Sequence, residues 1–380
     1  MRLGPHLAAF FTGALMIGCN ASSTRAETLT IGYIGSLTGA AAQYGLAGQE
    51  GLKIFAERVN AKGGFDLAGK NYVLKIVPYD DQQKPAQAVA AYERLTTIDG
   101  ARYVFVQNSP ATMAIKTKVE SDKTLMLTAA FSPKAIDADT KYTIRIYMNG
   151  DNFVPIYVRW LRDHLKERRV ATLNQNDETG WGYSQTTEKY LKENGFNVVA
   201  NQLYERSLSD FSPVLTKILA EKPELIDVGA TTPGTAGLIV RQAHELGYKG
   251  RFMQTGGPGW ATILAAAGKE ATEGMITMIY GDPNNPSYAD IANSYQKAVG
   301  QVPNELLVSW FDAADVLLKA MQIAGDAKDT TKVNAAFAKA LPAKSLQGET
   351  LNWGHQQILS VNYIAEIKDG KPVIIGKIPE

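Results

Sequence analysis

Short apolar runs alternate with longer amphipathic segments along nearly the whole chain. Residues 29–34 (LTIGYI) have the length and composition of a buried strand. The next segment carries apolar residues at the helical spacing i, i+3, i+4 and i+7, namely Leu52, Phe55, Ala56 and Val59. Because parallel strands need long crossover connections, this alternation predicts parallel sheets flanked by helices.

The alternation starts again after about residue 150, and this restart predicts a second unit of the same kind. We therefore expect an α/β fold with two doubly wound parallel-sheet lobes. The first lobe is expected to contain residues 27–147 and about 280–355, and the second residues 148–279 and about 356–380. The last predicted strands are residues 350–352, 358–367 and 373–375. Two-lobed folds of this class bind ligands between the lobes, at the carboxyl ends of the strands.

The first 26 residues are expected to be a secretory signal and not part of the fold. A short apolar run, residues 7–17, follows Arg2 and is too short to span a membrane. We expect cleavage after Ala26 and a periplasmic protein, with lipid attachment at Cys19 as the alternative. Cys19 is the only cysteine, so the chain cannot form an internal disulfide. The net charge of +1, with both signs evenly spread, argues against a nucleic-acid partner.

Residues 125–133 (LMLTAAFSP) are the most informative stretch for function. Their apolar start predicts the end of a buried strand, and Pro133 suits the first turn of a following helix. Such a junction leaves backbone N–H groups unpaired, and these groups together with the helix dipole can bind a small anion. Ser109, sixteen residues before Leu125, adds a hydroxyl. The alternative is an ordinary strand-to-helix turn with a serine N-cap.

The sequence contains no recognisable motif for catalysis or cofactor binding. His164, His244 and His355 are isolated, and the motifs G-x-S-x-G, G-x-G-x-x-G and G-x-x-x-x-G-K-[ST] are missing. Asp80 and Asp81 are adjacent and would point to opposite faces of a strand, so we expect a solvated turn and helix cap there. These observations favour a binding protein without catalytic residues, metal or cofactor over an enzyme.

The order of several motifs resembles that of a known family. The motifs are residues 31–64, 77–89, 125–132 (LMLTAAFS), 210–218 (DFSPVLTKI) and 252–257 (FMQTGG). Together they resemble the solute-binding receptors of branched-chain amino acid ABC transporters, the leucine/isoleucine/valine-binding family of type I periplasmic binding proteins. The resemblance implies a monomer whose two lobes, joined by three crossovers, close on a small ligand. It also implies delivery of that ligand to a permease in the inner membrane.

The resemblance further implies a set of ligand-binding residues: Tyr44, Ser109, Ala130, Phe131, Ser132, Trp181, Thr231 and Gly256. In the family, the serine matching Ser109 binds the ligand carboxylate, together with the backbone and hydroxyl groups of the AAFS segment. The residue matching Trp181 covers the ligand from the second lobe, where Thr231 also lines the pocket. Tyr44 matches an aromatic residue at the edge of the cleft.

Gly256 departs from the family pattern. Amino-acid receptors carry an acidic residue there, which holds the ligand ammonium, and an ammonium buried without such a partner is costly. The missing side chain is also expected to leave space near Trp181 and Trp260. We therefore expect a small carboxylate ligand that lacks an α-amino group, with aromatic acids among the candidates. The alternatives are a neutral amino-acid receptor that uses Asp177 or Glu178, a ligand sensor, and an exported hydrolase.

Overall fold

The computed structural model describes Met1 and residues 26–378. The expected signal segment, with Cys19, therefore lies outside the described residues except for its two ends. The helices are α1 (Ala42–Ala61), α2 (Pro85–Thr97), α3 (Ser109–Asp122), α4 (Gly150–His164), α5 (Glu178–Glu193), α6 (Ser212–Ala220), α7 (Pro233–Glu245), α8 (Trp260–Ala267), α9 (Lys269–Thr272), α10 (Pro286–Val299), α11 (Leu307–Ala324) and α12 (Thr330–Phe337), with 3₁₀ turns η1 (Pro133–Ala135) and η2 (Ala338–Ala340). The strands are β1 (Glu27–Gly35), β2 (Phe65–Leu67), β3 (Lys70–Asp80), β4 (Tyr103–Val106), β5 (Leu125–Thr128), β6 (Thr143–Arg145), β7 (Arg169–Gln175), β8 (Asn197–Tyr204), β9 (Leu225–Asp227), β10 (Arg251–Gln254), β11 (Ile276–Ile279), β12 (Ala343–Lys344), β13 (Thr350–Gly354), β14 (Gln357–Leu359), β15 (Asn362–Lys368) and β16 (Lys371–Ile378).

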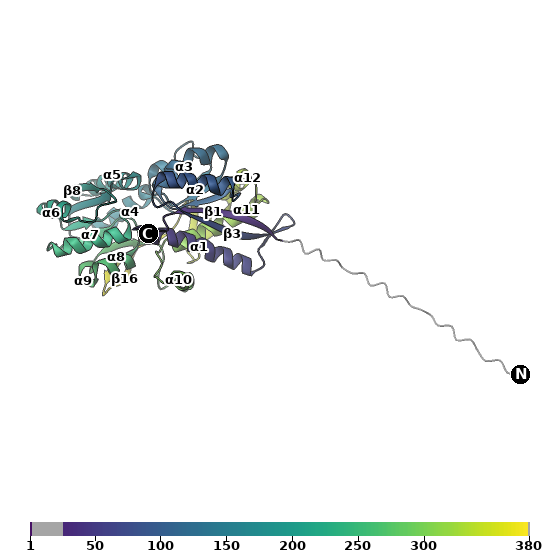
Figure 1. Cartoon of the computed structure of the whole chain (residues 1–380). Coiled ribbons are helices and arrows are strands. Elements are labelled where there is room, and N and C mark those ends of the chain that lie inside the picture. The colour runs from purple at the N-terminus through teal and green to yellow at the C-terminus, as the bar shows by residue number, and fades with distance from the viewer. Residues whose placement is uncertain (2–25, 379–380) are drawn as a thin grey trace.

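The strands of residues 26–378 form two sheets, one in each lobe (Figure 1). The first has the order β12-β13-β14-β6-β5-β4-β1-β3-β2, and the second has the order β16-β15-β11-β10-β9-β7-β8. The central strands of both sheets are parallel, whereas β2, β13, β15 and β16 pair antiparallel at the edges. Helices cover both faces, so the predicted α/β class is confirmed.

Helices cover both faces of the first sheet. Because successive side chains of a strand point to opposite faces, every side chain of its strands β4 and β5 is buried. Phe105 and Leu127 point to the side covered by α1 and α11. Val104 and Met126, one residue earlier on each strand, point to the side covered by α2 and α3. These strands are therefore continuously apolar, which is why they could be recognised in the sequence.

Within the described residues the chain crosses between the sheets three times, at residues 146–149, 280–285 and 360–361. The predicted single strand 358–367 is wrong, because β14 pairs with β6 in the first sheet whereas β15 pairs with β11 in the second. The third crossing therefore lies beyond the expected boundary near residue 355. The side chain of Gln357, on β14, donates to Asn152 Oδ1 at the start of α4 and so joins the lobes beside the crossings.

Two further local predictions are wrong. The helix expected at Pro133 is only the 3₁₀ turn η1, so this junction has no long helix dipole. Asp81 is buried, not solvated, and accepts hydrogen bonds from Ser36 Oγ (2.8 Å) and Asn108 Nδ2 (2.5 Å). It therefore ties the loop after β1 to the start of α3. None of the helices in residues 26–378 combines the length and hydrophobicity that a membrane span requires.

Candidate functional site

A cavity lies between the two lobes at the carboxyl ends of the central strands. Its lining residues are Tyr44, Gln83, Gln107, Asn108, Ser109, Ala129, Phe131, Tyr147, Gln175, Thr179, Arg206, Ala230, Thr232 and Leu306. Its volume is about 30 Å³, which is room for a water molecule or two. A ligand with a ring therefore needs the lobes or the lining side chains to move apart.

The topology explains why these residues meet. Gln107 directly follows β4, Ala129 directly follows β5, and Gln175 is the last residue of β7. Arg206 lies two residues after β8. In parallel α/β sheets the carboxyl ends of the strands form the crevice that binds ligands. Here two such crevices face each other.

Ser109 and the loop of residues 129–132 form the first-lobe wall. The Ser109 hydroxyl oxygen accepts the N–H groups of Phe131 (3.0 Å) and Ser132 (3.1 Å). Ser109 and Phe131 line the cavity, whereas Ala130 and Ser132, which the sequence also suggested, are buried outside the lining. A ligand carboxylate at this wall would therefore share or replace Ser109 as the acceptor of these N–H groups.

Tyr44 also lines the cavity, and its hydroxyl has no hydrogen-bond partner among the described residues. Burial raises the pKa of this phenol well above its usual value, so the hydroxyl keeps its proton. A neutral phenol can donate one hydrogen bond to a ligand. Thr231, by contrast, is buried outside the lining, where its hydroxyl donates to the Leu173 carbonyl (3.4 Å), while Thr232 reaches the cavity.

Gly256 does not leave the space that we expected. A Cβ atom at this position would lie 2.0 Å from the hydroxyl oxygen of Tyr183, because that ring fills the volume. Tyr183 is buried, donates to the Thr255 carbonyl (3.3 Å) and packs edge-on against Phe131, with ring centroids 5.3 Å apart. The space beside Gly256 is therefore occupied by a neutral aromatic residue.

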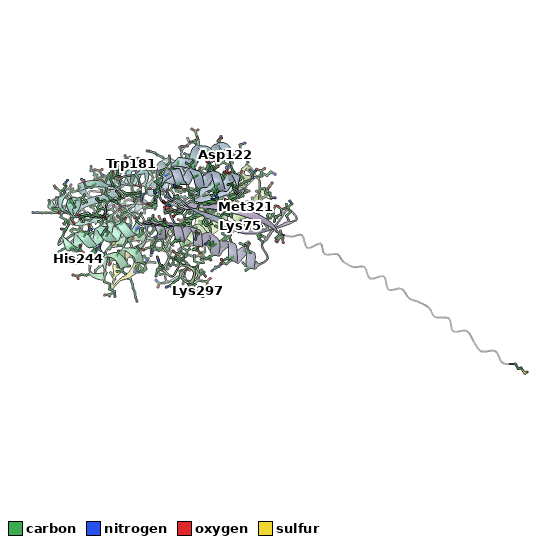
Figure 2. The ribbon with its side chains drawn as sticks, viewed as in Figure 1. Lys75, Asp122, Trp181, His244, Lys297 and Met321 are labelled. Carbon is green, nitrogen blue, oxygen red and sulfur yellow. The ribbon has the colours of Figure 1, made fainter. Side chains whose placement is uncertain are left out.

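Trp181 lies at the surface and not over the cavity (Figure 2). Its side chain is 43% exposed, and its indole Nε1 donates to Asn176 Oδ1 (2.8 Å). Thr179, on the inner side of α5, lines the cavity instead. Trp260 is also absent from the lining, and lies beside a separate pocket with Tyr288. Neither tryptophan covers the cavity in this structure.

Arg206 is the only cationic side chain among the described lining residues, and no Asp or Glu lines the cavity with it. Its guanidinium pairs with Asp177 in the same lobe. Its Nη1 atom donates across the cleft to Gln83 Oε1 (2.6 Å) on the first lobe. Asp177 also caps α5 by accepting the N–H groups of Thr179 and Gly180, so its carboxylate is fully engaged.

Glu178, the other acid considered for an ammonium, also lies outside the lining. Its Oε1 atom contacts Lys134 Nζ (3.2 Å) and accepts from Ser132 Oγ (3.4 Å), both on the first lobe. Glu178 therefore connects the lobes at the rim of the cleft. In residues 26–378, His, Cys, Asp and Glu side chains nowhere gather in a group of three that could bind a metal ion.

Sequence reasoning missed much of the polar lining, notably Gln83, Gln107, Gln175 and Arg206. All four lie within three residues of the carboxyl end of a strand. Considering every such position in both lobes would have found them. The bond between Gln83 and Arg206 has no local signal, because it depends on how the lobes approach each other.

Residues 28–372 match the periplasmic binding protein family. The chain belongs to that family. This periplasmic binding protein is 28% identical to the leucine-, isoleucine-, valine-, threonine- and alanine-binding protein of Pseudomonas aeruginosa, and the match covers 93% of this chain and 92% of the relative. The resemblance inferred from the motifs is thereby confirmed.

Two solved structures of solute-binding proteins share this fold. A leucine-binding protein of Thermotoga maritima superposes with a TM-score of 0.80 at 21% identity, covering 92% of this chain and 98% of that one. A solute-binding protein of an R. palustris ABC transporter, in complex with benzoate, gives a TM-score of 0.79 at 20% identity, covering 92% and 96%. These similarities confirm the two-lobed fold of this periplasmic binding protein.

Proposed function

We propose that this protein binds a small organic carboxylate without an α-ammonium group and delivers it to the permease of an ABC importer. The observation that carries the proposal is the charge of the cavity: a guanidinium, amides and hydroxyls line it, and no described lining residue is acidic. A buried ammonium without a carboxylate partner would be costly, whereas a carboxylate finds hydrogen-bond donors on both walls.

The apolar part of the lining supports an aromatic ligand. Tyr44, Phe131 and Tyr147 line the cavity. Phe131 and Tyr147 already pack edge-on, with ring centroids 5.4 Å apart. A flat ring can extend such an arrangement favourably. The structurally similar R. palustris protein was solved with benzoate, which has this chemistry.

We further propose that binding is coupled to closure of the lobes. The carboxylate binds first at Ser109 and the 129–132 loop, and the second lobe then brings Thr179 and Arg206 over the ligand. Three contacts across the cleft favour the closed form: Gln83 with Arg206, and Ser132 and Lys134 with Glu178. A ligand that contacts both lobes shifts the equilibrium toward closure. The protein would act as a monomer in the periplasm, exported through residues 1–26.

Thermal unfolding of the purified protein with a ligand panel tests the proposal. Benzoate and 4-hydroxybenzoate should raise the melting temperature, because a ligand that binds only the folded state stabilises it. Leucine should have no effect. Stabilisation by leucine, with no response to any aromatic acid, would overturn the proposed ligand class.

A neutral amino-acid receptor is the second candidate, and one buried acid favours it. Glu305 precedes the lining residue Leu306, and neither of its carboxyl oxygens has a hydrogen-bond partner among the described residues. Burial raises the pKa of Glu305 to about 8, and a nearby ammonium would lower it again. Loss of leucine binding in Glu305→Gln, with benzoate inactive in both proteins, would support this candidate.

A further inference from the structure

Arg145 is a buried cation without a buried counter-ion. It ends β6, and only 2% of its surface is exposed. Its guanidinium donates three hydrogen bonds of 2.8 Å, to the carbonyls of Ala130 and Ser132 and to Oε1 of Gln357. All three acceptors are neutral. No ion pair in the described part of the chain includes Arg145. The exposed carboxylate of Asp151 favours the charged form of Arg145 electrostatically without forming an ion pair with it.

An unpaired buried charge needs an explanation, because desolvation of an ion costs several kcal/mol. Burial lowers the pKa of Arg145 to about 10, so the guanidinium is still charged at neutral pH. Its hydrogen bonds give each guanidinium nitrogen one acceptor but do not neutralise the charge. Single buried charges are usually balanced by an opposite charge, and here the described chain places none in contact.

The contact with Ala130 aligns a peptide group with the cavity wall. The carbonyl of Ala130 and the N–H of Phe131 belong to one planar trans peptide, so they point in opposite directions. The carbonyl points to Arg145, and the N–H points to the Ser109 hydroxyl, which lines the cavity. The positive end of this peptide therefore faces the side on which a ligand carboxylate would bind.

We propose that Arg145 is the counter-charge of the ligand carboxylate and selects acids over their uncharged amides, acting through the 130–131 peptide without touching the ligand. This inference rests on the proposed function, since it requires a carboxylate at the first-lobe wall. Arg145 is then a positioning and specificity residue. The ligand supplies the negative charge that the protein interior lacks.

Gln357 offers a direct test, because Gln357→Glu places a carboxylate of the same shape beside the guanidinium. The new ion pair should neutralise Arg145 within the protein. Affinities for benzoate and benzamide, and for leucine and leucinamide, are measured by calorimetry on the wild type and the variant. The variant also loses the bond from Gln357 to Asn152, which affects acid and amide alike. We therefore expect the ratio of acid affinity to amide affinity to fall on the order of tenfold or more, as loss of a charged interaction implies.

Matched variants separate charge from structure. Gln296→Glu makes the same charge change at an exposed site of α10 and should leave both affinities unchanged. Arg145→Lys keeps the charge but loses the planar guanidinium, and should retain part of the preference for the acid, whereas Arg145→Met should lose it. Thermal unfolding identifies any variant that fails to fold.

The outcomes are distinguishable. If the wild type binds benzoate, and Gln357→Glu weakens benzoate and benzamide equally, the role of Arg145 is purely structural and this inference is overturned while the proposed function stands. If the wild type binds neither benzoate nor leucine, the proposed function fails and the counter-charge role fails with it. Selective loss of benzoate supports both, whereas selective loss of leucine in a protein that binds no benzoate supports the counter-charge role and overturns the proposed ligand class.

Discussion

The proposed closure of the lobes predicts a sensitive position, the glycine at their interface. Gly182, on α5 of the second lobe, faces Pro133 of the first lobe. A Cβ atom at Gly182 would lie 3.0 Å from Pro133 Cδ and 3.8 Å from the Cα of Ser132. Ordinary carbon contacts lie at ~3.5–4.0 Å, so even a methyl group forces a small separation here. Separating the lobes removes the contact, so only the closed form is penalised.

We expect Gly182→Ala to weaken ligand binding modestly and Gly182→Leu to weaken it strongly. Overpacking of a well-packed interface costs about 1–3 kcal/mol, which corresponds to roughly a 5- to 150-fold loss of affinity for the leucine variant. The free energy of unfolding of Gly182→Ala should rise even though its affinity falls, because alanine is favoured over glycine in a helix by ~1 kcal/mol.

Benzoate affinity by calorimetry and the radius of gyration by X-ray scattering, with and without ligand, measure these effects. Gly150→Ala is the matched control, because it also lies in a helix but its Cβ would meet nothing closer than 3.8 Å. It should bind and compact like the wild type. A Gly182→Leu protein that binds benzoate with wild-type affinity and closes normally would refute the closure argument.

Three further substitutions test the site and its surroundings. Ser132→Ala removes the bond from Ser132 Oγ to Glu178 across the cleft and should weaken benzoate binding by about 1–3 kcal/mol, the range for a hydrogen bond to a charged group, and an unchanged dissociation constant would show that this contact does not favour closure. Gly256→Glu should lower the melting temperature without creating leucine binding, because its Cβ would lie 2.0 Å from the Tyr183 hydroxyl; a stable variant that binds leucine would contradict this. Burial raises the pKa of Glu305 to about 8 from 4.5. Between these values the folded state holds more protons than the unfolded state, so this residue makes stability fall as the pH rises. Glu305→Gln should therefore lose less melting temperature between pH 5 and pH 8 than the wild type, and an equal loss in both proteins would show that Glu305 ionises normally.

The alternation of strands and helices was readable from the sequence because each central strand is buried on both faces. The sequence did not indicate which of the two sheets a given strand joins. Residues 358–367 look like one strand, yet Ser360 and Val361 lie at a crossing between the sheets. Periodicity reports the local backbone and its burial, but pairing partners are set by contacts distant in sequence.

The structure places Ser109 and Phe131 of the first lobe at the cavity, whereas Trp181 of the second lobe lies outside its lining. Ser109 and Phe131 lie at strand ends of one lobe, so local reasoning and the family resemblance agree there. On α5 the buried residues Thr179, Tyr183, Thr187 and Leu191 recur every four positions and mark the inner face. Trp181 is about 200° around the helix from Thr179, and therefore faces solvent. Applying this periodicity to α5 would have assigned Trp181 to its outer face.

The hydrogen bonds of Gln357 have a mechanical consequence. Gln357 bonds to Arg145, which holds the 129–132 loop, and to Asn152, which belongs to the capping box of α4. Both partners flank the first crossing, so the carboxylate-binding wall lies close to the pivot of the hinge. Points near a pivot move little when the lobes separate, whereas Arg206 and Glu178 lie on the lobe that swings. The ligand can therefore bind to a first-lobe wall that is already formed in the open form. The second-lobe side of the cleft undergoes most of the displacement on closure.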